Sequence, residues 1–177
     1  MNYHMTAPPV SSQLPLDCSR LIVCETTGDW AAAIRRAIAE SPKSDDLTGW
    51  VVEARGFPQL LAAAQTHPAS LCVVEVTTDN AERAATVVEQ LHVRFPNLNI
   101  IAAIASQPAL VAEMILREAG ATYVARSRRD ADIIARIWQQ HSKIHPPREE
   151  TWRDQIFAQL PWFENPHSAF RTPQSHA

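Results

Sequence analysis

The chain alternates short apolar runs with longer stretches in which apolar residues recur at helical spacing. A run that is apolar at consecutive positions suits a strand covered on both faces, because a strand with one face in water alternates apolar and polar residues. Five such runs, each followed by an amphipathic stretch, predict five βα units around a parallel sheet. The runs are residues 21–24, 50–54, 71–76, 100–105 and 123–125.

The stretches between the runs show the helical pattern clearly. The first of them carries on one face Trp30, Ala33, Ile34, Ala37 and Ile38. Gly120 follows the fourth stretch as a natural C-terminal stop, and the last helix is expected to begin at Asp130. Glu53 places a charge inside the second run, which favours an edge position for that strand.

The two ends of the chain differ from its middle. Its 177 residues, 46% of them hydrophobic, allow one substantial core, but eight of the 13 prolines fall within residues 1–19 or 146–177. We therefore predict a flexible N-terminal arm at residues 1–19, one domain at 20–144 and a C-terminal tail at 145–177.

The tail contains one more amphipathic segment. Residues 148–160 predict a short helix whose apolar side chains are Trp152, Ile156, Phe157 and Leu160, with Trp162 directly after it. A helix of this length is marginal by itself, so we expect it to pack on this domain or to be captured by a groove of a partner protein.

Composition and motifs argue against several classes of function. The net charge is −3, and Arg126, Arg128 and Arg129 form a basic cluster without interleaved aromatic residues, so we expect no nucleic-acid partner. No apolar run approaches the ~20 residues that span a bilayer, and the first residues show no apolar secretory signal, so we expect a cytoplasmic protein without a membrane partner. The four glycines form no phosphate-binding loop or nucleophile elbow, which leaves an enzyme unsupported.

Cysteine and histidine give weak signals for metal binding. Cys18, Cys24 and Cys72 are an odd set without a CxxC spacing, and we expect free thiols. His141 and His145 share a helix face, but prolines follow at once and no third ligand is near in sequence, so we favour imidazoles placed at a negative helix C-terminus over a metal site.

Three segments resemble the receiver domain of bacterial response regulators. They are residues 20–25 (RLIVCE), 71–78 (LCVVEVTT) and 117–121 (REAGA). The resemblance covers about 125 residues and implies a flavodoxin-like, doubly wound α/β fold, in which a five-stranded parallel sheet has the order 2-1-3-4-5. To this fold the sequence adds the short C-terminal helix.

The residues that this resemblance assigns to a phosphorylation pocket depart from the family pattern. Working receivers end the first strand in two acidic residues that hold Mg²⁺, and here these positions are Glu25 and Thr26. The phosphoacceptor aspartate is replaced by Glu75, the Thr or Ser at the end of the fourth strand by Ile104, and the Lys of the fifth strand by Arg126. The longer glutamate is misplaced for an in-line transfer, and an ion pair between Glu75 and Arg126 is expected to lock the domain in one state.

These departures predict a stand-alone, phosphorylation-independent receiver-like module that acts through protein contacts, with no cofactor and no catalytic residue. The alternative is a small α/β enzyme or ligand-binding protein that uses the pocket around Glu25 and Glu75. A residual, weak Mg²⁺ site at these two carboxylates is one alternative, and their satisfaction by a helix start, a threonine hydroxyl or a basic partner is the favoured one. Ser106 is an alternative to Ile104 as the phosphate-sensing position.

The partner of such a module is a protein that the sequence does not identify. By the same resemblance, a homodimer is expected to use the fourth helix, fifth strand and fifth helix. Met114, Ile137 and Trp138 are the apolar candidates on that face.

Overall fold

The computed structural model describes residues 19–41, 47–105 and 110–146. The strands in this part of the chain are β1 (Leu21–Cys24), β2 (Val51–Ala54), β3 (Leu71–Val76), β4 (Asn99–Ile104) and β5 (Tyr123–Ala125). The α-helices are α1 (Asp29–Glu40), α2 (Phe57–Thr66), α3 (Ala81–Arg94), α4 (Leu110–Glu118) and α5 (Ala131–Ile144). Two short 3₁₀ helices, η1 (Leu47–Trp50) and η2 (Arg128–Asp130), precede β2 and α5.

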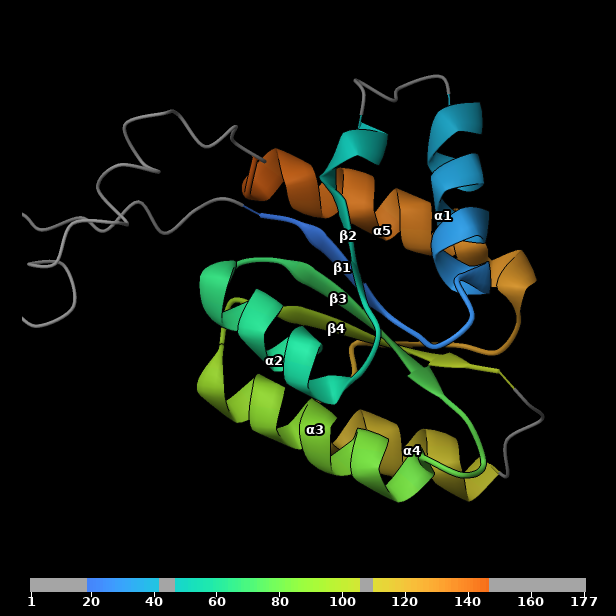
Figure 1. Ribbon diagram of the computed structural model, residues 1–177, viewed down its shortest axis with the longest axis vertical. Coiled ribbons are helices and arrows are strands. Elements are labelled where there is room, and N and C mark those ends of the chain that lie inside the picture. The colour runs from blue at the N-terminus through green and yellow to red at the C-terminus, as the bar shows by residue number, and fades with distance from the viewer. Residues whose placement is uncertain (1–18, 42–46, 106–109, 147–177) are drawn as a thin grey trace, which may run out of the picture. The chain divides into compact units, whose positions relative to one another are not determined.

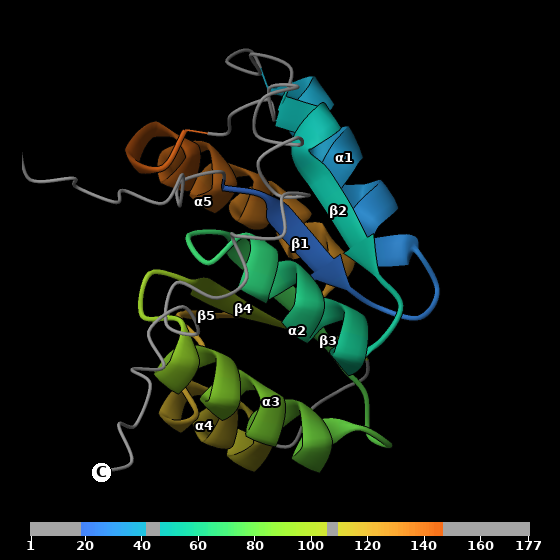
Figure 2. The same cartoon turned by 60° about the vertical axis from the view of Figure 1, so that its left-hand side comes forward.

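The five strands form one parallel sheet in the order β2-β1-β3-β4-β5, which confirms the predicted fold. Helices α1 and α5 cover one face of the sheet, and α2, α3 and α4 cover the other (Figures 1 and 2). This arrangement brings the carboxyl ends of β1 and β3 side by side, since the two central strands pair directly. Polar residues that follow these strands therefore meet at one edge.

Both faces of the central strands are buried, which explains why their sequences are continuously apolar. Leu21 and Val23 pack with Trp30 of α1 and Trp138 of α5. The other two residues of β1, Ile22 and Cys24, pack in the core on the opposite face of the sheet. Each strand thus contributes to two separate cores, as a sheet covered on both sides requires.

Strand β2 lies at an edge, as Glu53 within it predicts. The carboxylate of Glu53 forms ion pairs with Arg35 of α1 and with Arg55, which follows β2. The hydrogen bond from Arg35, which has the largest effect, lowers the pKa of Glu53 from its ordinary value. A partly exposed edge strand can keep such a charge beside solvent and its partners, whereas β1 and β3 are buried along their whole length.

Several element boundaries differ from the expected ones. Trp50 belongs to η1 and not to a strand, and α5 begins one residue after Asp130. Trp138 is fully buried, so its proposed place on a dimer face is wrong: its ring fills the core between α5 and the sheet. Met114 is 61% exposed and Ile137 is partly buried, so these two remain candidates for that face.

The predicted arm and tail lie mostly outside the described residues. Residues 1–18 and 147–177 are not described, so the tail helix at 148–160 stays a prediction. Within the described residues, no helix combines the length and the apolar character needed to cross a membrane.

Gly120 closes α4 as the sequence predicts. Its φ is +110°, in the left-handed region that side chains other than glycine adopt at a cost. Its amide donates to the carbonyl of Arg117, and the Ala121 amide donates to that of Leu116, so these two carbonyls of the last turn are satisfied. A Cβ at this position would lie 2.4 Å from Cγ of His92 on α3.

Replacing Gly120 by alanine is therefore expected to lower the free energy of unfolding by at least about 1 to 2 kcal/mol, since the backbone strain adds to the displacement of His92. Urea denaturation measures the loss. Gly49→Ala is the matched control, because nothing lies within 4 Å of a Cβ added there. Equal stability of the two variants would contradict this account of the α4 terminus.

Candidate functional site

The candidate site lies at the carboxyl edge of the two central strands. Glu75 is the fifth residue of β3, and Glu25 follows β1 directly. Both carboxylates are buried, with exposed fractions of 2% for Glu25 and 5% for Glu75. A buried carboxylate is costly unless hydrogen-bond donors surround it, so the donors decide what this edge can do.

Glu25 is satisfied by the start of α1. One carboxylate oxygen accepts a hydrogen bond from the Trp30 amide and the other from the Ala31 amide, both at 2.7 Å. These amides belong to the first turn of the helix, whose N–H groups have no partner within the helix. The positive end of the helix dipole lies at this same turn and also favours a negative charge. Glu25 thus takes the role of a helix cap, although Gly28 occupies the cap position in sequence.

Glu75 is satisfied by Thr26. Its Oε2 accepts from the backbone amide of Thr26 at 3.0 Å and from the Thr26 hydroxyl at 3.1 Å. A carboxylate at position 26 would place a second negative charge beside Glu75, but threonine supplies a donor in its place. The favoured interpretation of these two glutamates, satisfaction by a helix start and a threonine hydroxyl, is confirmed.

Asn80 holds the loop between β3 and α3 through its side chain, a role that the sequence pattern did not lead us to predict. Its side-chain nitrogen Nδ2 donates to the backbone carbonyl of Glu75, and its side-chain oxygen accepts from the backbone amide of Thr77 at 2.8 Å. Asn80 is also the residue at the N-cap position of α3. Asparagine directly before a helical stripe was the signal that could have identified it.

The expected ion pair between Glu75 and Arg126 is wrong. Arg126 donates to Oε2 of Glu113 on α4, through Nη2 at 2.6 Å and Nε at 3.0 Å. The other oxygen of Glu113 accepts from Arg117. The hydrogen bond from Arg126, followed by that from Arg117, holds the pKa of Glu113 below its ordinary value.

A physical reason favours the pair that the structure shows. Arg126 has a side chain 63% exposed, and at Glu113 it stays hydrated while it forms two hydrogen bonds. A contact with Glu75 would require the guanidinium to leave water for a carboxylate that Thr26 already satisfies. Arg128 likewise turns to a surface carboxylate, that of Asp29, at 2.5 Å.

Ile104, the residue that the resemblance assigns to the phosphate-sensing position, carries no hydroxyl. Ile104 is the last residue of β4, pairs with Val76 of β3 and is 4% exposed within the apolar core. Its side chain offers packing and no hydrogen bond. Ser106, the alternative for this role, lies outside the described residues.

A small cavity of about 240 Å³ lies at this edge. It is lined by Cys24, Glu25, Thr26, Gly56, Phe57, Pro58, Glu75, Asn80 and Arg83. Burial raises the pKa of the Cys24 thiol to about 11, so the reactive thiolate is disfavoured. Among the described residues, no group of three or more His, Cys, Asp or Glu side chains is arranged to hold a metal ion.

His141 at the opposite end of the sheet has a structural role. Its Nε2 lies 2.7 Å from the carbonyl of Ala69, and its Nδ1 lies 3.0 Å from the side-chain nitrogen of Asn99. The neutral ring with a proton on Nε2 satisfies both contacts. Burial lowers the pKa of His141, and the neighbouring His145, with ring centroids 5.0 Å apart, lowers it further. His141 therefore joins the C-terminal end of α5 to Ala69 and to Asn99 of β4.

Comparison with known proteins finds the same fold in solved structures. No family model and no curated protein matches this sequence. A response regulator from Thermotoga maritima has a TM-score of 0.55 at 11% identity, over 71% of this chain and 98% of that chain. A CheY-like protein from Pseudomonas aeruginosa PAO1 has a TM-score of 0.50 at 17% identity, over 68% of this chain and 93% of that chain. A putative pilus assembly-related protein from Burkholderia pseudomallei K96243 has a TM-score of 0.51 at 13% identity, over 71% and 92%.

The chain therefore has the flavodoxin-like fold of CheY-like receiver domains. At these identities the likeness concerns the fold alone. The structure brings Glu25, Thr26 and Glu75 together at the edge where receivers carry their pocket. It keeps Ile104 in the core and directs Arg126 to α4.

The cap formed by Glu25 generates a stability prediction. Glu25→Gln leaves only one good acceptor for two helix amides, so the free energy of unfolding is expected to fall by about 1 to 3 kcal/mol. Urea denaturation measures it. Glu40→Gln at the exposed end of the same helix is the control, and is expected to change stability by less than about 0.5 kcal/mol. A Glu25→Gln protein as stable as the control would contradict the capping role.

Proposed function

We propose that this chain is a phosphorylation-independent, receiver-like signalling module that acts by binding other proteins. The observation that carries the proposal is the internal use of both carboxylates at the carboxyl edge. Glu25 accepts from two amides of α1, and Glu75 accepts from the amide and hydroxyl of Thr26. A phosphoryl donor or Mg²⁺ that bound Glu25, or Oε2 of Glu75, would have to displace these hydrogen bonds.

The chemistry of phosphoryl transfer supports the same proposal. Transfer to a carboxylate depends on positioning and on a cation that neutralises the developing charge. Mg²⁺ takes oxygen ligands in strict octahedral geometry, and Thr26 supplies no carboxylate at the position where the family has an acidic residue. Arg126, at the position of the family's lysine, is engaged by Glu113, so the positive charge that would meet a phosphoryl group is turned away.

The geometry gives less support to an enzyme or a ligand-binding protein at this edge. The cavity of about 240 Å³ is smaller than the ~300 to 1,000 Å³ typical of ligand sites. Its thiol has a raised pKa, and its two carboxylates already have donors. No observation singles out a substrate, so the proposal remains one of protein binding.

Two surfaces are proposed for such contacts. The first is the face of α4, β5 and α5, where Met114 is exposed and a homodimer would form. The second is the predicted tail helix at 148–160 with Trp152, Ile156, Phe157 and Leu160, followed by Trp162. The cytoplasmic location stays a prediction.

Incubation with acetyl phosphate and Mg²⁺, followed by intact mass measurement, tests the absence of phosphorylation at Glu75. The protein is expected to gain no phosphoryl group there, because the acceptor is buried and hydrogen-bonded to Thr26. The Glu75→Gln variant is the matched control, and an active receiver in the same reaction confirms the reagents. A phosphoryl adduct that forms on the native chain and is lost in Glu75→Gln would overturn the proposal.

A further inference from the structure

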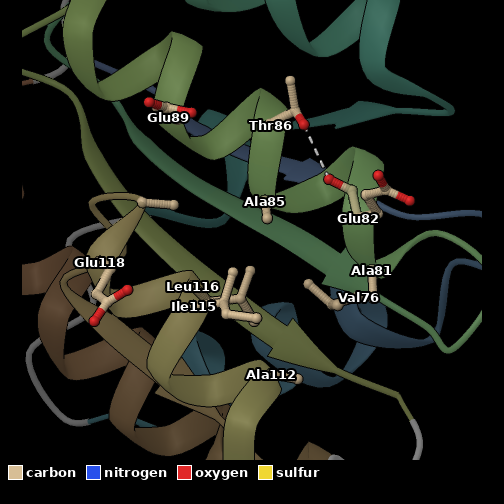
Figure 3. Close-up of a pocket in the computed structure, with 11 residues that line it drawn as sticks. Val76, Ala81, Glu82, Ala85, Thr86, Glu89, Ala112, Ile115, Leu116 and Glu118 are labelled. Atoms are coloured by element: carbon tan, nitrogen blue, oxygen red, sulfur yellow. Dashed lines mark hydrogen bonds between the residues drawn. The ribbon is translucent and has the colours of Figure 1, made fainter.

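A groove lies between α3 and α4, on the layer of α2, α3 and α4. Its volume is about 520 Å³, more than twice that of the cavity at the carboxyl edge. It is lined by Val76, Ala81, Glu82, Ala85, Thr86, Glu89, Ala112, Ile115, Leu116, Glu118 and Ala119. Figure 3 shows Ala85 of α3 and Ile115 of α4 at the same hollow, which we call the α3–α4 groove.

Small side chains on both helices explain why this groove is open. Four alanines line it, two on α3 and two at α4 and its C-terminal end. Their methyl groups leave a gap that larger residues would fill, so the apolar side chains of Val76 and Leu116 form its floor beneath the surface. Ile115 stands at the rim and is 47% exposed, which leaves apolar area for a partner to cover.

The charge of the groove is of one sign. Its three ionisable lining residues are Glu82, Glu89 and Glu118, and all three are exposed. None of them forms a salt bridge with any residue in the described part of the chain. Arg117 of α4 and Arg126, which follows β5, both form salt bridges with Glu113. The groove therefore presents an apolar floor between carboxylates that have no salt-bridge partner among the described residues.

The placement of these carboxylates matches the dimensions of a helix. Glu82 and Glu89 are seven residues apart on α3, which corresponds to two turns and roughly 10 Å along the axis. Figure 3 shows Glu89 and Glu118 toward one end of the groove and Glu82 toward the other. An amphipathic helix laid in the groove would place its apolar face on the floor and its flanking residues beside these acids.

We propose that the α3–α4 groove binds an amphipathic helix of a partner protein that carries lysine or arginine beside its apolar face. The inference rests on the proposed function only in that the chain acts through protein contacts, and it does not depend on the absence of phosphorylation. We expect positive charge on the partner because all the ionisable residues that line the groove are glutamates. It adds a defined surface and a defined partner chemistry to the two surfaces proposed above.

The chain's own segments fit the groove less well. Residues 148–160 carry three acidic residues against two arginines, and residues 1–18 contain no lysine or arginine. A second copy that applied the same face would bring the carboxylates of both copies together, since a two-fold interface uses one patch twice. A nucleic acid or an anionic lipid surface would meet the same repulsion.

The test uses the full chain and a synthetic amphipathic helix as the probe. The peptide has 14 residues, the length of α3, with leucines on one face and lysines beside them. Fluorescence anisotropy measures its affinity, and amide chemical shifts map the site. We expect binding that shifts resonances of α3 and α4, that weakens with added salt, and that falls about tenfold in the Glu89→Gln, Glu118→Gln double variant.

Matched controls separate this site from general attraction to an acidic protein. The Glu40→Gln, Asp132→Asn double variant removes two exposed carboxylates from the α1–α5 face and is expected to bind the peptide as the native chain does. Ala85→Leu fills the groove without a change of charge and is expected to abolish binding. A peptide with glutamates in place of the lysines is expected not to bind.

Several results would overturn the proposal. If the lysine and glutamate peptides bound equally well, charge complementarity would not explain the binding. If both double variants weakened binding equally, the α3–α4 groove would not be the binding site. Contacts between Ile115 and Trp152 in nuclear Overhauser spectra of the full chain would assign the groove to the tail. A dimer in sedimentation that Ala85→Leu dissociates would assign it to a second copy. None of these results bears on the acetyl phosphate experiment, so failure here leaves the absence of phosphorylation standing.

Discussion

The hydrogen bonds between the carboxylate of Glu25 and the first turn of α1 determine the rest of the carboxyl edge. Both oxygens accept hydrogen bonds from backbone amides at 2.7 Å, and the residue is only 2% exposed. The same contacts fix where α1 begins and so hold Trp30 in the core. Displacing the carboxylate would leave two buried amides without a partner, which costs about 1 to 3 kcal/mol for each.

Thr26 completes this arrangement at the neighbouring strand. Its amide and hydroxyl hold Oε2 of Glu75, so the acidic residues at the ends of β1 and β3 both accept hydrogen bonds from the chain itself. We propose that a receiver fold whose carboxylates are held in this way receives no phosphoryl group at this edge. On this proposal, regulation comes through the surfaces of the domain, and the groove between α3 and α4 combines an apolar floor with acidic residues.

The sequence predicted the five strands, the edge position of β2 and the stop at Gly120, because continuous apolar runs and a left-handed helix end have direct physical causes. The sheet order came from resemblance, since periodicity carries no information on which strands pair. Arg126 was misassigned because its partner Glu113 lies on α4, and only the three-dimensional arrangement shows that this carboxylate is within reach. Trp138 was misassigned because a helical stripe does not reveal which of its residues contact the sheet. The groove escaped prediction because it arises from alanines on two separate helices.

The central claim is that the carboxylates of Glu25 and Glu75 are satisfied within the fold and do not form a metal site. A Mg²⁺ titration of the full chain, followed through the amide resonances of Thr26, Trp30 and Ala31, tests it most directly. These amides donate to the two carboxylates, so they would move first if a cation displaced them. The account predicts no saturable shift beyond that seen with NaCl at equal ionic strength. A saturable shift of all three resonances at millimolar Mg²⁺, lost in Glu75→Gln, would contradict it.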